Sequence, residues 1–586
     1  MNEMRRTLLL VVFSMSLLML WDRWHVFNGQ GSMWSPRPQA TVATAPPHAA
    51  SAPAAMASAG EPTAVAAAAP SAGASEPAPE QVTITTDVIK ATLDTRGADL
   101  VGMDLLKYQP VFNHSELVDR LRHMVGMSVE PTPQGDVQIF ERGGGRFYVA
   151  QTGLTGEHGE SSWPRHLTVM RLVSPGRSLL PGQNELKLRF ESPDVGGVQL
   201  VKTYTFHRGQ YTIDVTHEVI NHSGAPVSPQ LYLQLVRDGE VDKGGYLSGP
   251  TSYTGPAVYT AGVFDKIAFS DIDKGKAAKE VDPQIQHDSG WIAMIQHYFA
   301  SAWVLPDGQQ RRFLLSALGP DVNGAPTFAV SALAPLGIIA PGASKTVQAT
   351  LFAGPQEEGV VAPVAPGFEL VKDYGWLKVL AQPLFWLLSK LHTLIGNWGW
   401  SIVALVVLLK IAFFGLNASA YRSMAKMKAI NPRVQELRER YKDKPQLMQQ
   451  EMMKIYKEEK VNPLGGCLPI LVQMPFFIAL YSVLLSTAEL RGAPWMGWIQ
   501  DLSAMDPWAI LPLLMLGTSL LQVALQPAPP DPTQARMMWL MPLMFSVMFF
   551  IFPAGLVLYW LTNNILSIAQ QWAINKKLGV GVGTTK

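Results

Sequence analysis

The sequence contains a single cysteine, Cys467, among 586 residues. One thiol excludes an intrachain disulfide and a cysteine-based metal cluster. Charge is scarce as well, because 16% of the residues are charged, whereas soluble globular chains carry about 25%. The net charge of +1 lacks the basic excess that attraction of the whole chain to nucleic acid requires, so no nucleic-acid substrate is expected. With 48% hydrophobic residues, part of the chain is expected to lie in lipid.

The N-terminal residues have the pattern of an export signal. Arg5 and Arg6 precede an apolar run from Leu8 to Trp21. No convincing small-x-small cleavage triplet follows, so we expect an uncleaved transmembrane anchor at 1–24 rather than a removed signal peptide. Residues 25–80 are expected to be a linker, because 36–80 contain 18 Ala and 9 Pro and no aromatic residue.

A region of period-two alternation extends over 81–366. Between Tyr211 and Val219, mostly apolar residues alternate with Thr, Asp and Glu, as in a half-buried strand. Similar short runs recur, separated by Gly, Pro, Asn and Asp. The pattern predicts a large antiparallel sandwich, and the preceding anchor places this domain outside the cytoplasm.

The remaining sequence is strongly apolar and predicts five further spans. Residues 373–396 are interrupted by polar side chains on one side of a helix, so we expect an amphipathic helix in the membrane interface. The five spans are expected at 398–417, 467–485, 508–526, 537–552 and 556–574. The fourth is short, about 24 Å at helical rise, so it is either shielded from lipid or surrounded by a locally thin bilayer.

The distribution of charge predicts the orientation of these spans. Segment 421–464 carries 11 basic and 6 acidic residues and is expected to be a cytoplasmic helical hairpin, whose first arm starts at Pro432. Segment 486–507 carries one basic and three acidic residues and faces the other side. The basic tail at 575–586 is cytoplasmic again, so six spans with both termini in the cytoplasm are predicted.

The motifs of soluble enzymes are missing from the sequence. Residues 341–346 end like a phosphate-binding loop, but Ser344 stands where that motif requires glycine, so a surface turn is the better interpretation. His-Glu-x-x-His and Gly-x-Ser-x-Gly do not occur. We therefore predict no catalytic residue, no metal site and no cofactor, and the chain is not expected to be an enzyme.

The most informative residue is Lys410, which lies inside the predicted span 398–417. It is about 18 Å from the outer end of the span, and a charge at the bilayer centre costs at least about 2.5 kcal/mol. Such a side chain faces water or a partner; the alternative is a lysine that extends to the cytoplasmic interface.

The last span carries polar residues at helical spacing. Trp560, Asn563, Asn564, Ser567 and Gln571 fall on one face of a helix. Interhelical hydrogen bonding would explain this stripe equally well. Together with Lys410, a hydrated groove becomes the better interpretation, and Gln473 in the span 467–485 adds a further polar group.

Four stretches of the C-terminal half resemble a known family, the YidC membrane protein insertases of Gram-negative inner membranes, within the wider YidC/Oxa/Alb family. These stretches are Tyr421–Lys428, Lys460–Pro469 with the following Gln473–Pro475, Asp501–Pro507 and Phe552–Trp560. The resemblance implies a polytopic α-helical membrane protein with six spans and a five-helix insertase core, plus a large periplasmic all-β supersandwich domain.

The resemblance also implies a groove that is open to cytoplasm and lipid and holds one basic residue. The family usually has Arg where Lys410 stands and Pro at Gly415. Lysine keeps the charge but lacks the bidentate fork of arginine, so long-range attraction is expected to matter more than bidentate pairing. The expected groove residues are Lys410, Gln473, Trp560, Asn563, Asn564 and Ser567, and the residues along which substrates slide are Met474, Pro475, Phe545 and Met548.

The expected function is insertion and folding of inner-membrane proteins, alone or with the Sec translocon. Expected partners are nascent membrane proteins, the Sec translocon with its accessory subunits, the lipid bilayer, and the ribosome through the basic hairpin and tail, although the hairpin charge also fits a solvated surface. One alternative is a channel or transporter with a periplasmic sensing domain. Another is an enzyme, with Lys410 as a base or the β-domain as a sugar-processing unit; Ser401 lies on the opposite helix face from Lys410 and cannot pair with it.

Overall fold

The computed structural model describes residues 78–577, apart from 111–119, 121–134, 144, 157–161, 241–252, 280, 322–323, 376, 442–443, 460–467 and 527–531. The expected anchor at 1–24 and nearly all of the expected linker at 25–80 lie outside the described residues. The same holds for residues 578–586 of the expected tail.

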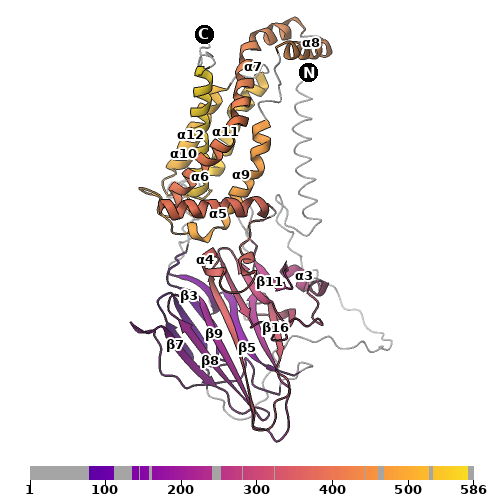
Figure 1. The fold of residues 1–586 in the computed structure, drawn as a ribbon, viewed down its shortest axis with the longest axis vertical. Coiled ribbons are helices and arrows are strands. Elements are labelled where there is room, and N and C mark those ends of the chain that lie inside the picture. The colour runs from indigo at the N-terminus through magenta and orange to yellow at the C-terminus, as the bar shows by residue number, and fades with distance from the viewer. Residues whose placement is uncertain are drawn as a thin grey trace, which may run out of the picture. The chain divides into compact units, whose positions relative to one another are not determined.

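The N-terminal half of the described chain forms two antiparallel sheets (Figure 1). In spatial order, the first contains β1 (Gln81–Thr85), β2 (Ile89–Asp94), β3 (Asp99–Leu105), β4 (Val137–Gly143), β5 (Arg146–Thr155), β10 (Gln230–Asp238), β16 (Pro326–Pro335) and β15 (Arg312–Pro320). The second contains β12 (Val263–Lys266), β11 (Gly255–Thr260), β13 (Trp291–Gln296), β14 (Phe299–Val304), β17 (Ser344–Pro355), β9 (Thr212–Asn221), β8 (Val198–His207), β7 (Glu185–Glu191) and β6 (Arg171–Leu172). Short helical turns lie at α3 (Phe269–Asp273), η1 (Ala277–Lys279), α4 (Glu358–Val361) and η2 (Phe368–Val371).

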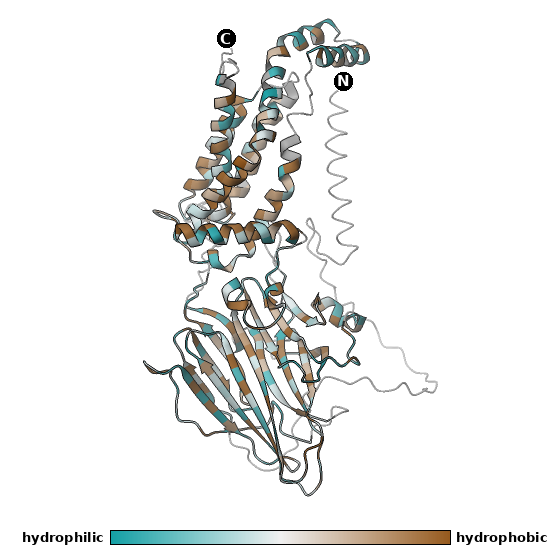
Figure 2. Cartoon of the chain, viewed as in Figure 1, coloured by the Kyte–Doolittle hydropathy of each residue, from teal (hydrophilic) through white to brown (hydrophobic). Residues whose placement is uncertain are grey.

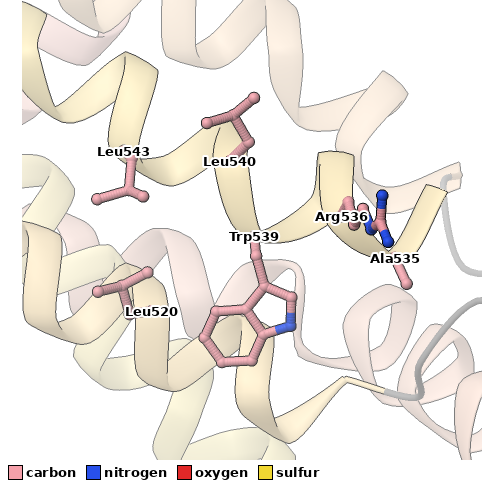
Figure 3. A pocket seen from close by; sticks show the side chains of 6 residues that line it. All are labelled: Leu520, Ala535, Arg536, Trp539, Leu540 and Leu543. Atoms are coloured by element: carbon pink, nitrogen blue, oxygen red, sulfur yellow. The ribbon is translucent and has the colours of Figure 1, made fainter. Parts of the chain in front are cut away.

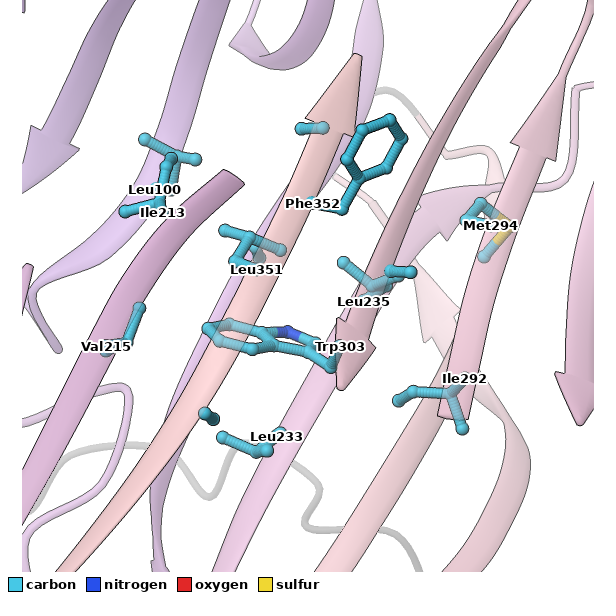
Figure 4. Close-up of a cluster of buried hydrophobic side chains, with 14 of the residues drawn as sticks. Leu100, Ile213, Val215, Leu233, Leu235, Ile292, Met294, Trp303, Leu351 and Phe352 are labelled. Carbon is cyan, nitrogen blue, oxygen red and sulfur yellow. The ribbon is translucent and has the colours of Figure 1, made fainter. Parts of the chain in front are cut away.

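The two sheets share one hydrophobic core. In β9 every second residue is buried, among them Ile213 and Val215, and these face the other sheet. Trp303 of β14 is buried between leucines of both sheets (Figure 4), and its Nε1 donates a hydrogen bond to the carbonyl oxygen of Gln234 in β10 at 3.2 Å. The predicted β-sandwich is therefore confirmed, and its period-two alternation reflects one buried face per strand.

The C-terminal half is helical. Its elements are α5 (Lys378–Ile395), α6 (Trp398–Ala412), α7 (Phe414–Arg440), α8 (Pro445–Glu458), α9 (Leu468–Ser486), η4 (Ala488–Leu490), α10 (Ile510–Leu525), α11 (Pro532–Phe549) and α12 (Ala554–Lys577). The last helix packs against α6, α7 and α10, and α5 packs across the ends of α6 and α9 (Figure 1). Figure 2 shows that α6 is largely hydrophobic, whereas α8 carries both hydrophilic and hydrophobic residues.

Two helices differ from the expected spans. The expected span 398–417 is broken, because Phe413 leaves the helical conformation and the axes of α6 and the start of α7 meet at 65°. Gly415 lies in the first turn of α7, where its low helix propensity favours a break. The helix at the expected short span begins earlier than predicted, at Pro532, and its 18 residues extend over about 27 Å.

The hairpin also differs from the prediction at one point. Pro432 does not begin a helical arm but lies inside α7, which continues from the bent pair to Arg440. Within the described residues, no single helix is both long and apolar enough to cross a bilayer by itself. The bent pair formed by α6 and the first part of α7 meets both criteria, and α9 and α10 contain shorter apolar segments.

Candidate substrate groove

Lys410 lies in the last turn of α6 and is half-buried between helices. Its Nζ donates a hydrogen bond to Oγ of Ser567 on α12 at 2.7 Å. The Ser567 hydroxyl in turn donates to the backbone oxygen of Asn563 at 2.7 Å, so it has a lone pair for the lysine. Among the described residues no carboxylate forms an ion pair with Lys410, and this bond uses one of the three donors of its ammonium group.

The polar stripe of α12 is divided between two neighbouring helices. Ser567 turns toward Lys410, but Asn564 is buried against α10, where its Nδ2 donates to Oγ of Ser519 at 2.9 Å. Gln571 is also buried and donates to the backbone oxygen of Leu525 at 3.2 Å. Asn564 and Gln571 thus make the interhelical hydrogen bonds that were the alternative for this stripe, whereas Ser567 faces Lys410.

Trp560 belongs to an aromatic cluster rather than to the surroundings of Lys410. Its ring meets Phe477 of α9 edge to face at 4.5 Å and Phe549 of α11 at 4.9 Å between centroids. It precedes Ser567 by two turns, about 10.5 Å along the helix. This cluster joins α9, α11 and α12.

Gln473 forms the other polar contact of the site. Its Nε2 donates to Oδ1 of Asn417 on α7 at 2.8 Å. Asn417 is buried, and its Nδ2 has no hydrogen-bond partner among the described residues. A buried amide donor without a partner costs free energy unless water or a ligand reaches it.

Both halves of the chain match family models. Residues 81–387 match the YidC periplasmic domain, and residues 390–580 match the 60Kd inner membrane protein family. A membrane protein insertase YidC from Cupriavidus necator is 49% identical and covers 99% of this chain and 98% of its own. One from Bordetella petrii is 47% identical, with 98% of each chain covered. The chain belongs to the YidC family of membrane protein insertases.

A crystal structure of an active YidC insertase is similar over 84% of this chain and 92% of that chain, with 16% identity and a TM-score of 0.38. A likeness at that level carries no weight in the assignment. The family models and relatives establish the function as a membrane protein insertase of the inner membrane, with a periplasmic domain. This function rules out the two alternatives raised by the sequence, a channel or transporter with a sensing domain and an enzyme.

The expected slide residues of this insertase lie on the two helices where they were sought. Met474 on α9 and Phe545 on α11 expose 46% and 48% of their surface. Pro475 and Met548 are half-buried. Large exposed apolar side chains on these two helices can contact an apolar segment without a fixed shape, and Met adapts to many partners.

Among the residues that contact the predicted site and were missed are two polar ones. Asn417 binds Gln473, and Ser519 binds Asn564. Both are polar residues in largely apolar expected spans, Asn417 being the last residue of 398–417. That signal was present in the sequence, but it did not indicate which helices would meet.

The β-domain contains a second group of buried ionisable residues. Lys202 is fully buried, and its Nζ donates to the backbone oxygens of Gly97 and Thr152 at 2.5 and 2.7 Å. Beside it, Nε2 of His217 lies 3.0 Å from the Thr152 hydroxyl. Burial, with a smaller contribution from Lys202, lowers the pKa of His217 to about 3. These residues bond one another and the backbone inside the sandwich, which fits a structural role.

Proposed function

We propose that Lys410 attracts the acidic flank of an incoming membrane segment, while the apolar part of that segment moves along α9 and α11 into the lipid. The observation that carries the proposal is the pairing of Lys410 with the neutral hydroxyl of Ser567. A half-buried ammonium that is bonded to a hydroxyl keeps its net charge, and two of its donors remain for a carboxylate.

The energetics require neither a nucleotide nor covalent chemistry. Transfer of apolar surface from water to lipid supplies the driving force. The membrane potential adds about 2.3 kcal/mol per charge per 100 mV for acidic flanks that move outward. The Asn417 amide, which has no partner among the described residues, can donate to a polar flank and so lowers the cost of bringing that flank into the site.

Reconstitution in liposomes tests this role. For a small substrate with an acidic flank, we expect Lys410→Glu to lower translocation about tenfold, the effect of about 1.4 kcal/mol of lost attraction. Lys410→Arg should retain activity, because it keeps the charge. A version of the substrate with an uncharged flank should respond much less to Lys410→Glu.

Asn564→Ala is the matched control, because Asn564 is buried on α12, the helix of Ser567, but bonds Ser519 of α10 rather than Lys410. It should leave the difference between acidic and uncharged flanks intact. Full activity of Lys410→Glu with the acidic substrate would disprove the electrostatic role.

We further propose that nascent chains reach the groove directly from the ribosome or through the Sec translocon and its accessory subunits. The hairpin supports ribosome contact, since 421–464 carries an excess of basic residues. Part of that charge is used inside the hairpin, where Arg433 of α7 bonds Glu459 after α8 at 2.6 Å. Basic side chains outside such pairs can bind ribosomal RNA or anionic lipid.

A further inference from the structure

A shallow apolar groove lies between α10 and α11, and Lys410 is not among its lining residues. It has a volume of about 440 Å³ and is lined by Leu520, Ala535, Arg536, Trp539, Leu540 and Leu543 (Figure 3). The last three expose 47% of their surface each. Arg536 is the one charged residue in the sequence of these two helices, and no carboxylate among the described residues forms an ion pair with it.

The course of the chain places this arginine at the cytoplasmic end of the helices. The segment between α9 and α10 contacts the periplasmic β-domain, where the Arg491 guanidinium lies 5.1 Å from the ring of Phe299. The end of α11 returns to the same side, since Met505 and Pro553 form a β-bridge. The beginning of α11, with Arg536 in its second turn, is therefore at the opposite end.

The groove residues occupy one face of α11. Arg536, Trp539, Leu540 and Leu543 follow the spacing i, i+3, i+4, i+7, which aligns side chains on a helix. At 100° per residue, Phe545 lies about 160° around the helix from Leu543 and about 180° from Arg536. The groove is thus on the face opposite the substrate slide, so a substrate that moves along the slide does not fill it.

We propose that this groove binds one anionic phospholipid of the cytoplasmic leaflet. The planar guanidinium of Arg536 can donate two parallel hydrogen bonds to the headgroup phosphate. Trp539 has the amphipathic ring that favours the headgroup level, and the leucines contact an acyl chain. Basic pockets between membrane helices on the cytoplasmic side are suited to anionic headgroups. The net negative charge of the lipid is complementary to a groove that offers one cation and no acid among its lining residues.

Native mass spectrometry of the full-length protein in detergent tests the proposal, with phosphatidylglycerol and phosphatidylcholine added in turn. The wild type should retain phosphatidylglycerol in preference. Arg536→Gln should lower that retention about fivefold, the effect of about 1 kcal/mol per basic residue at an anionic surface. Arg536→Lys should retain part of the preference. Leu543→Trp, which fills the apolar end, should lower the retention of both lipids.

Arg433→Gln is the control, because Arg433 is an exposed arginine of the hairpin that is paired with Glu459; it should bind lipid like the wild type. Equal retention of the two lipids, or an unchanged preference in Arg536→Gln, would overturn the proposal. Displacement of the lipid by soluble glycerophosphate would show a phosphate site without an acyl chain. Crosslinking of a nascent chain from position 539 would show a substrate site instead, and either result would contradict the proposed lipid.

Discussion

Two lysines are buried in different ways, and the difference decides what each can do. Lys202 is enclosed by the sandwich and donates to two backbone oxygens. Near it, burial raises the pKa of the Asp99 carboxyl to about 7. Nη2 of Arg142 lies 3.8 Å from Oδ2 of Asp99. Lys410 is only half-buried and bonds one hydroxyl. The first lysine is part of the core, whereas the second can accept a new partner.

The buried histidine predicts an acid dependence of β-domain stability. Because the pKa of His217 is about 3 when folded and about 6.5 when unfolded, the unfolded state binds the extra proton between these values. The contribution of His217 to stability is complete above pH 6.5 and is lost as the pH falls, by about 1.4 kcal/mol per pH unit. His217→Gln should therefore flatten the decline in the free energy of unfolding between pH 6.5 and 4, measured by hydrogen exchange of β9 amides in the full chain.

Asp99 gives this prediction a control of opposite sign. Its raised pKa means that the folded state binds the extra proton between about pH 4 and 7, so its contribution to stability is lost as the pH rises. Asp99→Asn should steepen the acid decline that His217→Gln flattens. Identical slopes in the wild type and His217→Gln would show that the histidine does not titrate as the structure indicates.

At the scale of elements, one buried ion pair joins the start of the helical region to the segment after α9. Lys372, just before α5, bonds both carboxylate oxygens of Glu489 in η4, at 3.0 and 2.9 Å. Glu489 also accepts the backbone N–H of Glu358 in α4 at 3.0 Å. The Lys372 ammonium lies 3.6 Å from the ring centroid of Phe385 in α5. Three elements, α4, α5 and η4, therefore depend on this ion pair for their mutual placement.

Glu489→Gln should strongly destabilise the packing of α4, α5 and η4 around this ion pair. The substitution removes the ion-pair partner of the buried Lys372, and removal of one partner of a buried pair costs about 3 to 5 kcal/mol. We expect faster hydrogen exchange in α5 and easier proteolysis between 366 and 378 in the purified protein. The double variant Lys372→Met with Glu489→Gln should recover much of the protection, because no unpaired charge remains. Equal protection from exchange and proteolysis in Glu489→Gln and the wild type would contradict this role of the ion pair.

At the scale of the molecule, a net charge of +1 conceals an uneven distribution. The hairpin region carries 11 basic and 6 acidic residues, whereas 486–507 carries one basic and three acidic residues. The segment after α9 contacts the periplasmic β-domain through Arg491 and Phe299. The acidic segment thus lies on the outer side, and the hairpin is expected on the inner side.

The single cysteine makes this orientation easy to test. In a Cys467→Ser background, we expect Lys187→Cys of the β-domain to react with a membrane-impermeant maleimide in intact spheroplasts. Lys457→Cys of the hairpin should react only after the membrane is permeabilised. Both side chains are exposed in the structure, so accessibility of the protein surface does not limit either reaction. Labelling of Lys457→Cys in intact spheroplasts would refute a cytoplasmic hairpin.

The sequence by itself determined the fold class, the family and the presence of a lysine where lipid would be costly. These follow from local pattern: alternation of period two, apolar stretches, and short motifs. The boundaries of the membrane segments stay predictions. Sequence pattern also placed polar residues on one face of α12, because helical spacing alone gives that face.

Only the tertiary structure decided how that face is used. Ser567 meets Lys410 on α6, while Asn564 meets Ser519 on α10. It also decided the break at Phe413 and the pairing of Gln473 with Asn417. The periodicity of one helix determines which side chains share a face, but the neighbours of that face depend on packing between segments far apart in the chain. The physical reason is that hydrogen bonds between helices are selected by the three-dimensional arrangement, which no local pattern contains.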